Sequence, residues 1–210
     1  FKQEYLSDFV NYSGAIYYNF NREENVLKEY IPSSNTIHIG VDFNLDPMSA
    51  VVSEVKQDYL YVYDEIVIYG SNTDELVEEI NNRYSGKHIF VYPDPASKQR
   101  KTSAGGRTDL SILKNAGYNV RVRNAHPLVR DRINAVNTKL KNTKGVRTLF
   151  IANNCKNVIK SIERQIYKEG TSLPDKENNY DHMNDALGYL IEFLYPIRTH
   201  FKPSPPKRFS

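Results

Sequence analysis

The chain has 210 residues, of which 28 are lysine or arginine and 25 are aspartate or glutamate, and its formal net charge is +3. No stretch approaches the roughly 18 consecutive apolar residues of a membrane span, and the first residues lack the pattern of a secretory signal. The single cysteine, Cys155, excludes an internal disulfide framework and a zinc site made of several cysteines, and it fits a reducing compartment. We therefore expect one sizeable domain with no membrane partner.

The first half of the chain is rich in strand patterns. Residues 1–34 mix aromatic and charged side chains and form a lead-in to the first regular element. Apolar side chains then recur at every second position, as in β-strands, and one stretch has helical spacing behind Ser71, Asn72 or Thr73 as N-cap. In chain order we expect a strand, a β-hairpin, a helix and a strand at residues 37–43, 49–55 with 59–69, 71–84 and 87–95.

The second half alternates helices with strands. We expect helices at residues 109–117, 127–140, 154–167 and 180–195, and strands at residues 118–123 and 147–152. The proline-rich residues 197–210 are expected to be a disordered tail. This order predicts an α/β fold with a mixed β-sheet, which starts as three antiparallel strands and continues with parallel strands, and with helices on both faces.

Two of the expected strands carry an aspartate at or near their end. Asp42 lies in Gly-Val-Asp-Phe-Asn and Asp94 in Val-Tyr-Pro-Asp-Pro. If the two strands are neighbours, both carboxylates emerge at the same edge of the sheet, where the adjoining loops leave a crevice. Two close carboxylates repel unless a cation lies between them, and oxygen ligands favour Mg²⁺ or Mn²⁺. On its own, each aspartate also fits a strand cap or a turn.

The last expected helix supplies further candidates. One apolar stripe should face the sheet, and it consists of Met183, Leu187, Leu190, Ile191 and Leu194. Asp181 and Asp185 share the opposite side, and His182 lies three residues before Asp185. Helical phasing leaves two alternatives open: Asp185 lines a cleft, or Asp181 stabilises the helix N-terminus while Asp185 faces water.

Together these residues fit one chemistry. Carboxylates from two strand ends and a late helix can hold two divalent ions about 4 Å apart, which clamp a phosphodiester and activate a water. His182 fits three roles: a metal ligand, a residue that contacts a ligand, or a proton-transfer partner. The other histidines are not expected to be ligands; they are His38, His88, His126 and His200.

The basic residues are unevenly distributed. Residues 1–97 carry 6 lysines and arginines against 16 acidic residues, whereas residues 98–147 carry 13 against 2. Such a block can attract nucleic acid, although a solvated surface gives the same pattern. Four cations follow Asp94 and can neutralise phosphates near a cleavage site, namely Lys98, Arg100, Lys101 and Arg107. The basic region continues with Arg121, Arg123, Arg130, Arg132, Lys139, Lys141 and Lys144.

The order of the motifs resembles a known family. A strand with Gly-Val-Asp-Phe-Asn, a β-hairpin, a strand ending in Tyr-Pro-Asp-Pro and the helix Tyr-Asp-His-Met-Asn-Asp-Ala-Leu-Gly-Tyr resemble the ribonuclease H-like nuclease domain of large terminase subunits. These subunits are the DNA-packaging motors of tailed bacteriophages. Residues 4–20 resemble the segment that joins the packaging ATPase to the nuclease, so the resemblance runs from about the N-terminus to Tyr195.

The resemblance implies a site and a reaction. The family's three acidic residues fall on Asp42, Asp94 and Asp185 and its histidine on His182, so these four residues are expected to be catalytic and to hold metal. Asp181 is implied as an extra metal ligand, and the expected cofactor is Mg²⁺ or Mn²⁺, bound as two ions. The expected activity is endonucleolytic cleavage of double-stranded, concatemeric viral DNA during packaging. Asp46, in the turn after the first strand, is expected to have a structural role.

The resemblance also implies partners and a domain organisation. The expected partners are double-stranded DNA, the portal protein and the small terminase subunit, in the host cytoplasm. Residues 1–34 would be a lead-in from an ATPase domain, and residues 35–196 would be the nuclease domain. The phosphate-binding motif of that ATPase, Gly-x-x-x-x-Gly-Lys-Ser/Thr, does not occur in this sequence.

Three other functions stay open at this point. A Holliday-junction resolvase or a transposase core shares the fold and the chemistry, and a nuclease-dead module would bind DNA or dock without metal. An actin-like ATPase also ends its first strand in aspartate. That fold needs a phosphate turn rich in glycine, serine and threonine, which residues 42–47 do not supply.

Overall fold

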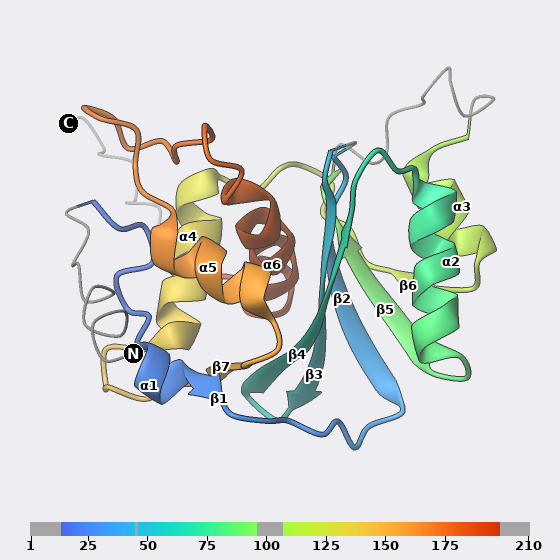
Figure 1. Ribbon diagram of the computed structural model, residues 1–210, viewed down its shortest axis with the longest axis horizontal. Helices are drawn as coiled ribbons and strands as arrows, with labels where there is room; N and C mark the ends of the chain where they lie inside the picture. Colours follow the sequence, from blue (N-terminus) through green and yellow to red (C-terminus); the bar gives the residue numbers. More distant parts are fainter. Residues whose placement is uncertain (1–13, 45, 96–106, 198–210) are drawn as a thin grey trace, which may run out of the picture.

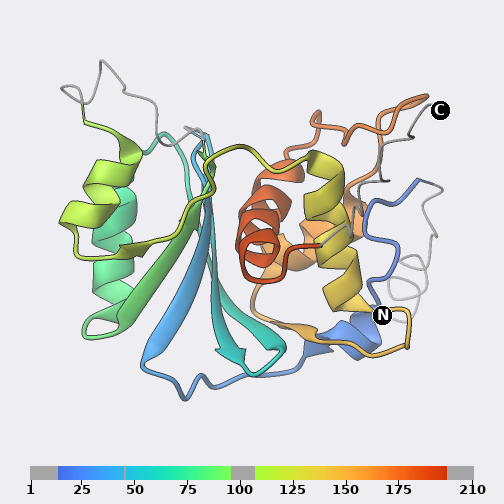
Figure 2. The same ribbon diagram turned by 180° about the vertical axis from the view of Figure 1, so that it is seen from behind.

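Two layers of helices enclose the central sheet. This computed structural model describes residues 14–44, 46–95 and 107–197. Helices α2 (Thr73–Tyr84) and α3 (Asp109–Asn115) lie on one face of the sheet, and α4 (Val129–Leu140), α5 (Lys156–Arg164) and α6 (Asp181–Leu194) lie on the other (Figures 1 and 2). The predicted α/β fold with helices on both faces is thereby confirmed.

The described residues form a seven-stranded mixed sheet. Its strands are β1 (Val26–Leu27), β2 (Thr36–Asp42), β3 (Met48–Lys56), β4 (Tyr59–Ile68), β5 (His88–Pro93), β6 (Asn119–Val120) and β7 (Leu149–Ala152). They are ordered β1-β7-β4-β3-β2-β5-β6, with β2, β3 and β4 antiparallel and the other pairs parallel. In β2, Ile37, Ile39 and Val41 are buried while His38 and Asp42 are half-buried, as the period-two pattern predicts.

The lead-in contributes to the sheet, which the sequence pattern does not predict. After the single turn of α1 (Arg22–Asn25), the two residues of β1 pair in parallel with Ile151 and Ala152 of β7. Ile16 is fully buried in the core. Residues 14–27 therefore pack against the rest of the chain, while their origin as a linker from an ATPase domain stays a prediction.

The predicted strand at residues 118–123 is mostly wrong. Only Asn119 and Val120 pair with β5. Beyond them the Arg123 guanidinium bonds to the Glu192 carboxylate and to backbone carbonyls at the end of α6, so the chain leaves the sheet edge and crosses toward the other helical layer. The predicted helix at residues 154–167 is also shorter, because Ile166 and Tyr167 form β-bridges instead.

Helix α6 packs closely on β2. The predicted apolar stripe is confirmed, since Met183, Leu187, Leu190 and Ile191 are buried and Leu194 is half-buried. Gly40 in β2 lies directly under the helix: a Cβ atom added there would be 2.1 Å from the carbonyl oxygen of Ala186. Only glycine permits this approach of a helix backbone to a strand.

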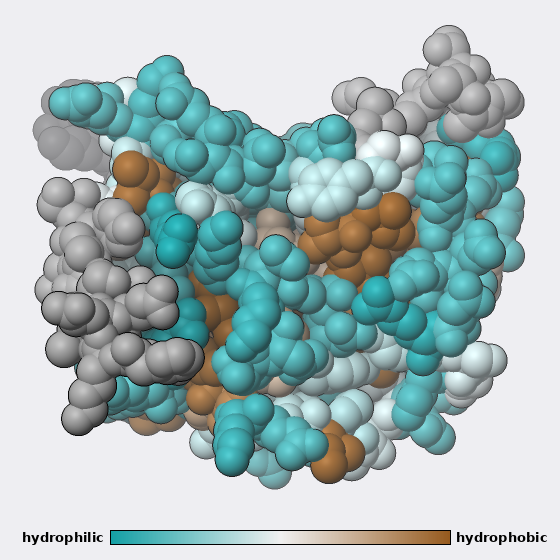
Figure 3. Space-filling view, viewed as in Figure 1, coloured by the Kyte–Doolittle hydropathy of each residue, from teal (hydrophilic) through white to brown (hydrophobic). Residues whose placement is uncertain are grey.

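The opposite face of the sheet is less completely covered. Figure 3 shows a largely hydrophilic surface on which apolar side chains gather between α2 and the sheet. Val67 and Ile68 of β4 and Val77 of α2 are half-buried hydrophobic residues that pack against the core. The helix of this layer thus leaves part of the apolar surface in contact with solvent.

Candidate active site

The register of the sheet brings two predicted aspartates together. Asp42 is the last residue of β2, and Asp94 directly follows β5. The two strands are parallel neighbours with Val41 opposite Pro93, and the Asp94 backbone N–H donates to the Val41 carbonyl at 3.2 Å. The carboxyl ends of both strands therefore carry their aspartates side by side at one edge of the sheet.

The close packing of α6 on β2 adds the third aspartate. Asp185 immediately precedes Ala186, whose carbonyl lies over Gly40, and Asp42 lies two residues beyond Gly40 in β2. Burial raises the pKa of the Asp185 carboxyl, Arg132 opposes this rise, and the negative charge of Asp42 raises the pKa further. The carboxylates of Asp42 and Asp185 are thus close enough to repel each other.

Asp185 does not face water, so the second alternative left open by the helical phasing is wrong. Its side chain is 24% exposed and accepts a hydrogen bond at 2.7 Å from Nη1 of Arg132 on α4. Arg132 is itself buried, and although burial works against the cation, Asp185 raises the Arg132 pKa. The neighbouring helix, not the phase of α6 alone, determines the environment of Asp185.

His182 lies between two carboxylates. Its Nδ1 is 3.1 Å from Oδ2 of Asp42, and its Nε2 is 3.8 Å from Oδ1 of Asp181. The hydrogen bond with Asp42 raises the pKa of the imidazole, against the effect of burial, and Asp181 and Asp185 add to the rise. The imidazole therefore tends to carry a proton beside Asp42.

Asp181 is buried at the start of α6. Its Oδ2 forms an ion pair at 3.0 Å with Nζ of Lys176, whose side chain is 69% exposed. Its Oδ1 is buried and has no hydrogen-bond partner among the described residues. A buried carboxylate oxygen without a donor is unfavourable, and it is a potential ligand for a cation.

Tyr189 lies near all three predicted acidic ligands. It is on α6, one turn after Asp185, and its ring is largely buried. Burial raises the pKa of its phenol most; Arg132 lowers it, and the negative charges of Asp185, Asp94 and Asp42 raise it. One tyrosine hydroxyl thus experiences the charge of carboxylates from β2, from the end of β5 and from α6.

The donor chemistry of this edge fits a divalent cation with a preference for oxygen ligands. Within the described ranges, however, no three His, Cys, Asp or Glu side chains are close enough together to hold a metal ion. Each acid contacts a nitrogen atom instead, in the pairs Asp42–His182, Asp94–His126, Asp185–Arg132 and Asp181–Lys176. The residue types fit the cation, and small side-chain rotations would be needed to gather the oxygens.

The predicted DNA-contacting residues are only partly described. Lys98, Arg100 and Lys101 lie outside the described residues. Arg107 is exposed and forms a two-bond ion pair with Asp74 of α2, with distances of 3.2 and 3.1 Å. The structure therefore puts Arg107 beside α2, at the helical layer opposite α6.

Part of the predicted basic region is not a solvent-facing surface. Arg132 and Lys139 are buried, Lys139 donating to the backbone carbonyl of Asp58, and Arg123 pairs with Glu192. For these three residues the expectation of a DNA-contacting surface is wrong, because each satisfies an internal acceptor. Arg130 is exposed, with a side chain that is 74% accessible, and pairs only with its neighbour Asp131.

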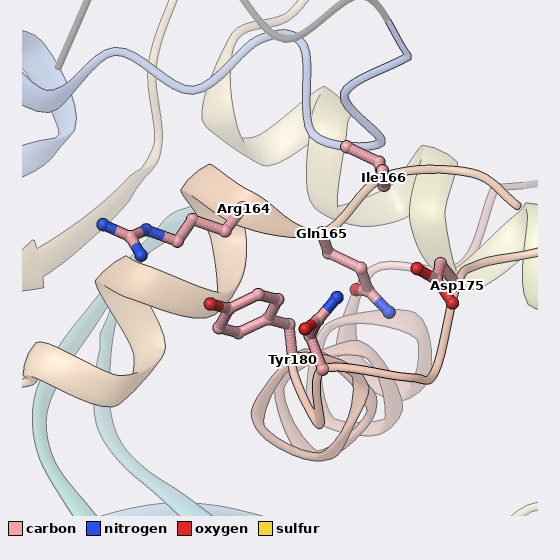
Figure 4. A pocket seen from close by; sticks show the side chains of 6 residues that line it. Arg164, Gln165, Ile166, Asp175 and Tyr180 are labelled. Carbon is pink, nitrogen blue, oxygen red and sulfur yellow. The ribbon is translucent and has the colours of Figure 1, made fainter. Parts of the chain in front are cut away.

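A hollow near the start of α6 is separate from the acidic residues. It has a volume of about 190 Å³ and is lined by Arg164, Gln165, Ile166, Asp175, Asn178 and Tyr180 (Figure 4). Its described lining includes none of the four aspartates. The acidic residues thus lie at an open edge of the sheet, which suits a large substrate better than a small molecule.

Four residues around the acids were missed from the sequence. They are Asn44, whose side-chain amide lies 3.2 Å from Nε2 of His182, together with His126, Arg132 and Lys176. Asn44 follows Asp42 by two positions and was detectable as part of the same turn. The other three come from distant segments, and the sequence offers no spacing signal for them.

A family model described as "Terminase RNaseH-like domain" matches residues 39–193. The structure is similar to the large terminase from a thermophilic bacteriophage, with 21% identity and a TM-score of 0.67 over 85% of this chain and 45% of that chain. It is also similar to the large terminase nuclease domain of P22, with 14% identity and a TM-score of 0.63 over 86% and 93% of the two chains. The chain thus spans about half the length of the first of these two proteins.

A third similar structure is the large terminase nuclease from thermophilic phage G20c with bound magnesium. It has 14% identity and a TM-score of 0.58 over 84% of this chain and 97% of that chain. A search of the curated proteins finds no match. Among the described residues, every helix is too short or too polar to cross a bilayer.

Proposed function

The chain belongs to the terminase RNaseH-like domain family, and on this premise we propose that it is the nuclease domain of a large terminase subunit. In this role it is a metal-dependent endonuclease that cuts double-stranded, concatemeric viral DNA during genome packaging. The nuclease domains of P22 and G20c support the fold. The catalytic assignment is an inference from the residues at the sheet edge.

One observation carries the proposal. Asp42 from β2, Asp94 from the end of β5 and Asp185 from α6 converge at one open edge of the sheet. Repulsion between Asp42 and Asp185 is an unfavourable arrangement for a site with only structural roles, because uncharged side chains would pack there at lower cost. A cation shared by the carboxylates would remove this repulsion.

We propose that Asp42, Asp94 and Asp185 are ligands of Mg²⁺ or Mn²⁺, with His182 and Asp181 as further ligands or neighbours of the ligands, in a site for two ions. Carboxylate oxygens are the ligands that these hard cations prefer. When bound, such ions supply Lewis acid chemistry to a phosphodiester and to an attacking water. The magnesium bound to the G20c nuclease is consistent with this choice.

The chain's own residues orient the acids and exclude water. His182 holds the Asp42 carboxylate through Nδ1, and Asn44 contacts the same imidazole. The imidazole can donate its proton at Nδ1 or accept one there, so it is suited to move a proton near the substrate. Tyr189 covers the buried side of the site with its ring, which lowers the local polarity around Asp185.

Lys98, Arg100, Lys101 and Arg107 are proposed to contact DNA phosphates. All four follow Asp94 within 13 residues of sequence, so they belong to the segment that leaves the site. Phosphate contacts position a duplex without reading its bases, and weak sequence preference is therefore expected. The exposed pair of Arg107 with Asp74 does not oppose this role, because exposed ion pairs are worth only about 0–1 kcal/mol.

The organisation of the whole protein is also a proposal. Residues 1–34 would connect an ATPase domain to the nuclease domain at residues 35–196, with residues 197–210 as a tail. The chain covers 45% of the large terminase from the thermophilic bacteriophage, which leaves room for such a domain in a longer protein. The portal protein and the small terminase subunit would be its partners, and the host cytoplasm its location.

The test is cleavage of supercoiled plasmid by the purified chain with Mn²⁺. The wild type should nick or linearise the plasmid, and Asp42→Asn, Asp94→Asn and Asp185→Asn should each reduce the rate at least about 100-fold, since each removes a charge from the metal site. Asp58→Asn is the matched control. Asp58 is exposed in the β3–β4 turn, at the end of β3 opposite the residue that pairs with Asp42.

The outcomes separate the candidate functions. Unchanged cleavage in the three folded variants would contradict the assignment of the acids. Binding of plasmid without cleavage and without any effect of Mn²⁺ would favour a nuclease-dead DNA-binding module. A strong preference for four-way junctions or transposon ends over plain plasmid would favour a resolvase or transposase.

A further inference from the structure

Arg132 is a buried cation in the interface between α4 and α6. Its side chain is 8% exposed, although it lies in the most basic block of the sequence. Burial of a charged group is unfavourable unless the group is paired and hydrogen-bonded. The position of Arg132 therefore depends on what α6 offers it.

Three residues of α6 hold the guanidinium. Nη1 donates to Oδ1 of Asp185 at 2.7 Å, and the guanidinium carbon lies 4.3 Å from the centroid of the Tyr189 ring. Gly188 leaves the space that the side chain occupies, since a Cβ atom there would lie 3.7 Å from Nη1. The hydrogen bond, the cation–π contact and the packing together allow the guanidinium one position.

The contact uses only one oxygen of Asp185. Among the described residues, Oδ2 of Asp185 accepts no hydrogen bond, and Nε of Arg132 is buried without a partner. An ion pair that served only to join α4 to α6 would be strongest as a two-bond fork between guanidinium and carboxylate. The single bond fixes the carboxylate and leaves its second oxygen available.

We propose that Arg132 is a positioning residue, which holds Oδ1 of Asp185 so that the other oxygen is presented to a divalent cation shared with Asp42. The inference rests on the proposed function. Residues that hydrogen-bond to a metal ligand orient it and reduce the freedom that it would lose on binding. The helix α4 thus contributes to a site whose acids come from β2, β5 and α6.

A competing role for Arg132 predicts the opposite effect. A cation that merely neutralises Asp185 competes with the metal, so its removal would strengthen metal binding. Lys176 is suited to such a role, because its side chain is 69% exposed and can move into solvent. Arg132 is enclosed by Tyr189 and cannot leave in the same way, which favours the positioning role.

The experiment measures Mn²⁺ binding by isothermal titration calorimetry without DNA. Arg132→Met removes the charge and the donor, whereas Arg132→Lys retains the charge without the planar guanidinium. We expect the Mn²⁺ dissociation constant to rise about 10-fold or more in Arg132→Met and by a smaller factor in Arg132→Lys. Arg130→Met is the control on the same helix, and it should stay within about twofold of the wild type because its exposed charge is screened.

Equal or tighter Mn²⁺ binding by folded Arg132→Met would overturn the positioning role. If circular dichroism shows that this variant does not fold, unchanged affinity in Arg132→Lys overturns the role in the same way. In cleavage assays at saturating Mn²⁺, the positioning role predicts a lower kcat with little change in KM for DNA. A wild type that binds no Mn²⁺ refutes the proposed function and this inference together, whereas equal binding by wild type and variant refutes this inference alone.

Discussion

The carbonyl oxygen of Ala186 in α6 occupies the space where a side chain at Gly40 in β2 would begin. A Cβ atom at Gly40 would lie 2.1 Å from that oxygen and 2.9 Å from Cβ of Leu190. The helix is thereby held against the strand next to Asp185, two residues of β2 away from Asp42. The same contact that completes the core sets the separation between two proposed metal ligands.

We predict that Gly40→Ala destabilises the fold and reduces cleavage. The added methyl group must displace α6, because the atom that it meets belongs to the helix backbone and cannot rotate away. The free energy of unfolding should fall by about 3 kcal/mol, at the upper end of the usual cost of overpacking. Urea unfolding measures this change, and plasmid cleavage with Mn²⁺ should decline in the fraction that remains folded.

Gly188→Ala is the matched control for this prediction. The same methyl group on α6 would meet Arg132 at 3.5 Å, an ordinary van der Waals distance. Replacing glycine by alanine inside a helix stabilises it by about 0.5–1 kcal/mol. A loss of stability in Gly188→Ala equal to that in Gly40→Ala would show that the close approach at Gly40 is not the cause.

Glu54 connects the lead-in to the sheet. Its carboxylate is almost fully buried and accepts hydrogen bonds from the Tyr30 hydroxyl at 2.5 Å and from the backbone N–H of Ser34 at 2.8 Å. Burial raises the pKa of this carboxyl, but the hydrogen bonds from Tyr30, Ser33 and Ser34 outweigh burial and lower the pKa below its ordinary value. We predict that Glu54→Gln reduces the free energy of unfolding at pH 7 by about 2 kcal/mol, as for hydrogen bonds to a charged group.

The effect should depend on pH in one direction. Because the pKa of Glu54 is lower in the folded state, its contribution is complete above the unfolded pKa near 4.5 and is lost as the pH falls through the folded pKa. Urea unfolding of wild type and Glu54→Gln from pH 7 to pH 3 should show a difference that shrinks below about pH 4.5. Glu78→Gln, at an exposed position, is the control, and a difference that grows toward low pH would contradict the account.

We predict that Arg107→Gln weakens DNA binding to the same extent for different DNA sequences. If Arg107 neutralises one phosphate, the slope of log K against log salt concentration should fall by about 0.9. Asp74→Asn, which removes the acid that pairs with Arg107, should tighten binding slightly. Fluorescence anisotropy with labelled duplexes at several salt concentrations measures both effects.

Lys28→Gln is the control for the DNA prediction, because Lys28 is exposed and lies outside the basic block. Its salt slope should match that of the wild type. An unchanged slope in Arg107→Gln would remove Arg107 from the phosphate contacts. A loss of affinity for one sequence only would mean that Arg107 contacts bases.

Much of the fold could be predicted because the core elements carry strong periodic patterns. Alternation in residues 37–43 and the apolar stripe of α6 each follow from the burial of one face. The two-residue strand β1 could not be predicted, because Val26 and Leu27 show no period of their own and are held by pairing with β7. β6 was predicted too long, because Arg123 leaves the strand for a partner on α6.

The candidate site could be predicted in its acids but not in their partners. Asp42 and Asp94 stand at strand ends, a local feature of the sequence, and parallel pairing of β2 with β5 then brings them together. The environment of Asp185 depends on Arg132, which is 53 residues away and comes from another helix. No periodicity within α6 contains that contact, so the cleft-lining and water-facing positions were equivalent from the sequence.

The most direct test of the account is an anomalous difference map from a crystal of the chain soaked in Mn²⁺. The account predicts at least one strong peak bounded by carboxylate oxygens of Asp42, Asp94 and Asp185. It also predicts that the Asp185 oxygen nearest the peak is the one that does not accept from Arg132. A fully soaked crystal without a peak at these carboxylates, or with peaks only elsewhere on the chain, would contradict the proposed metal centre.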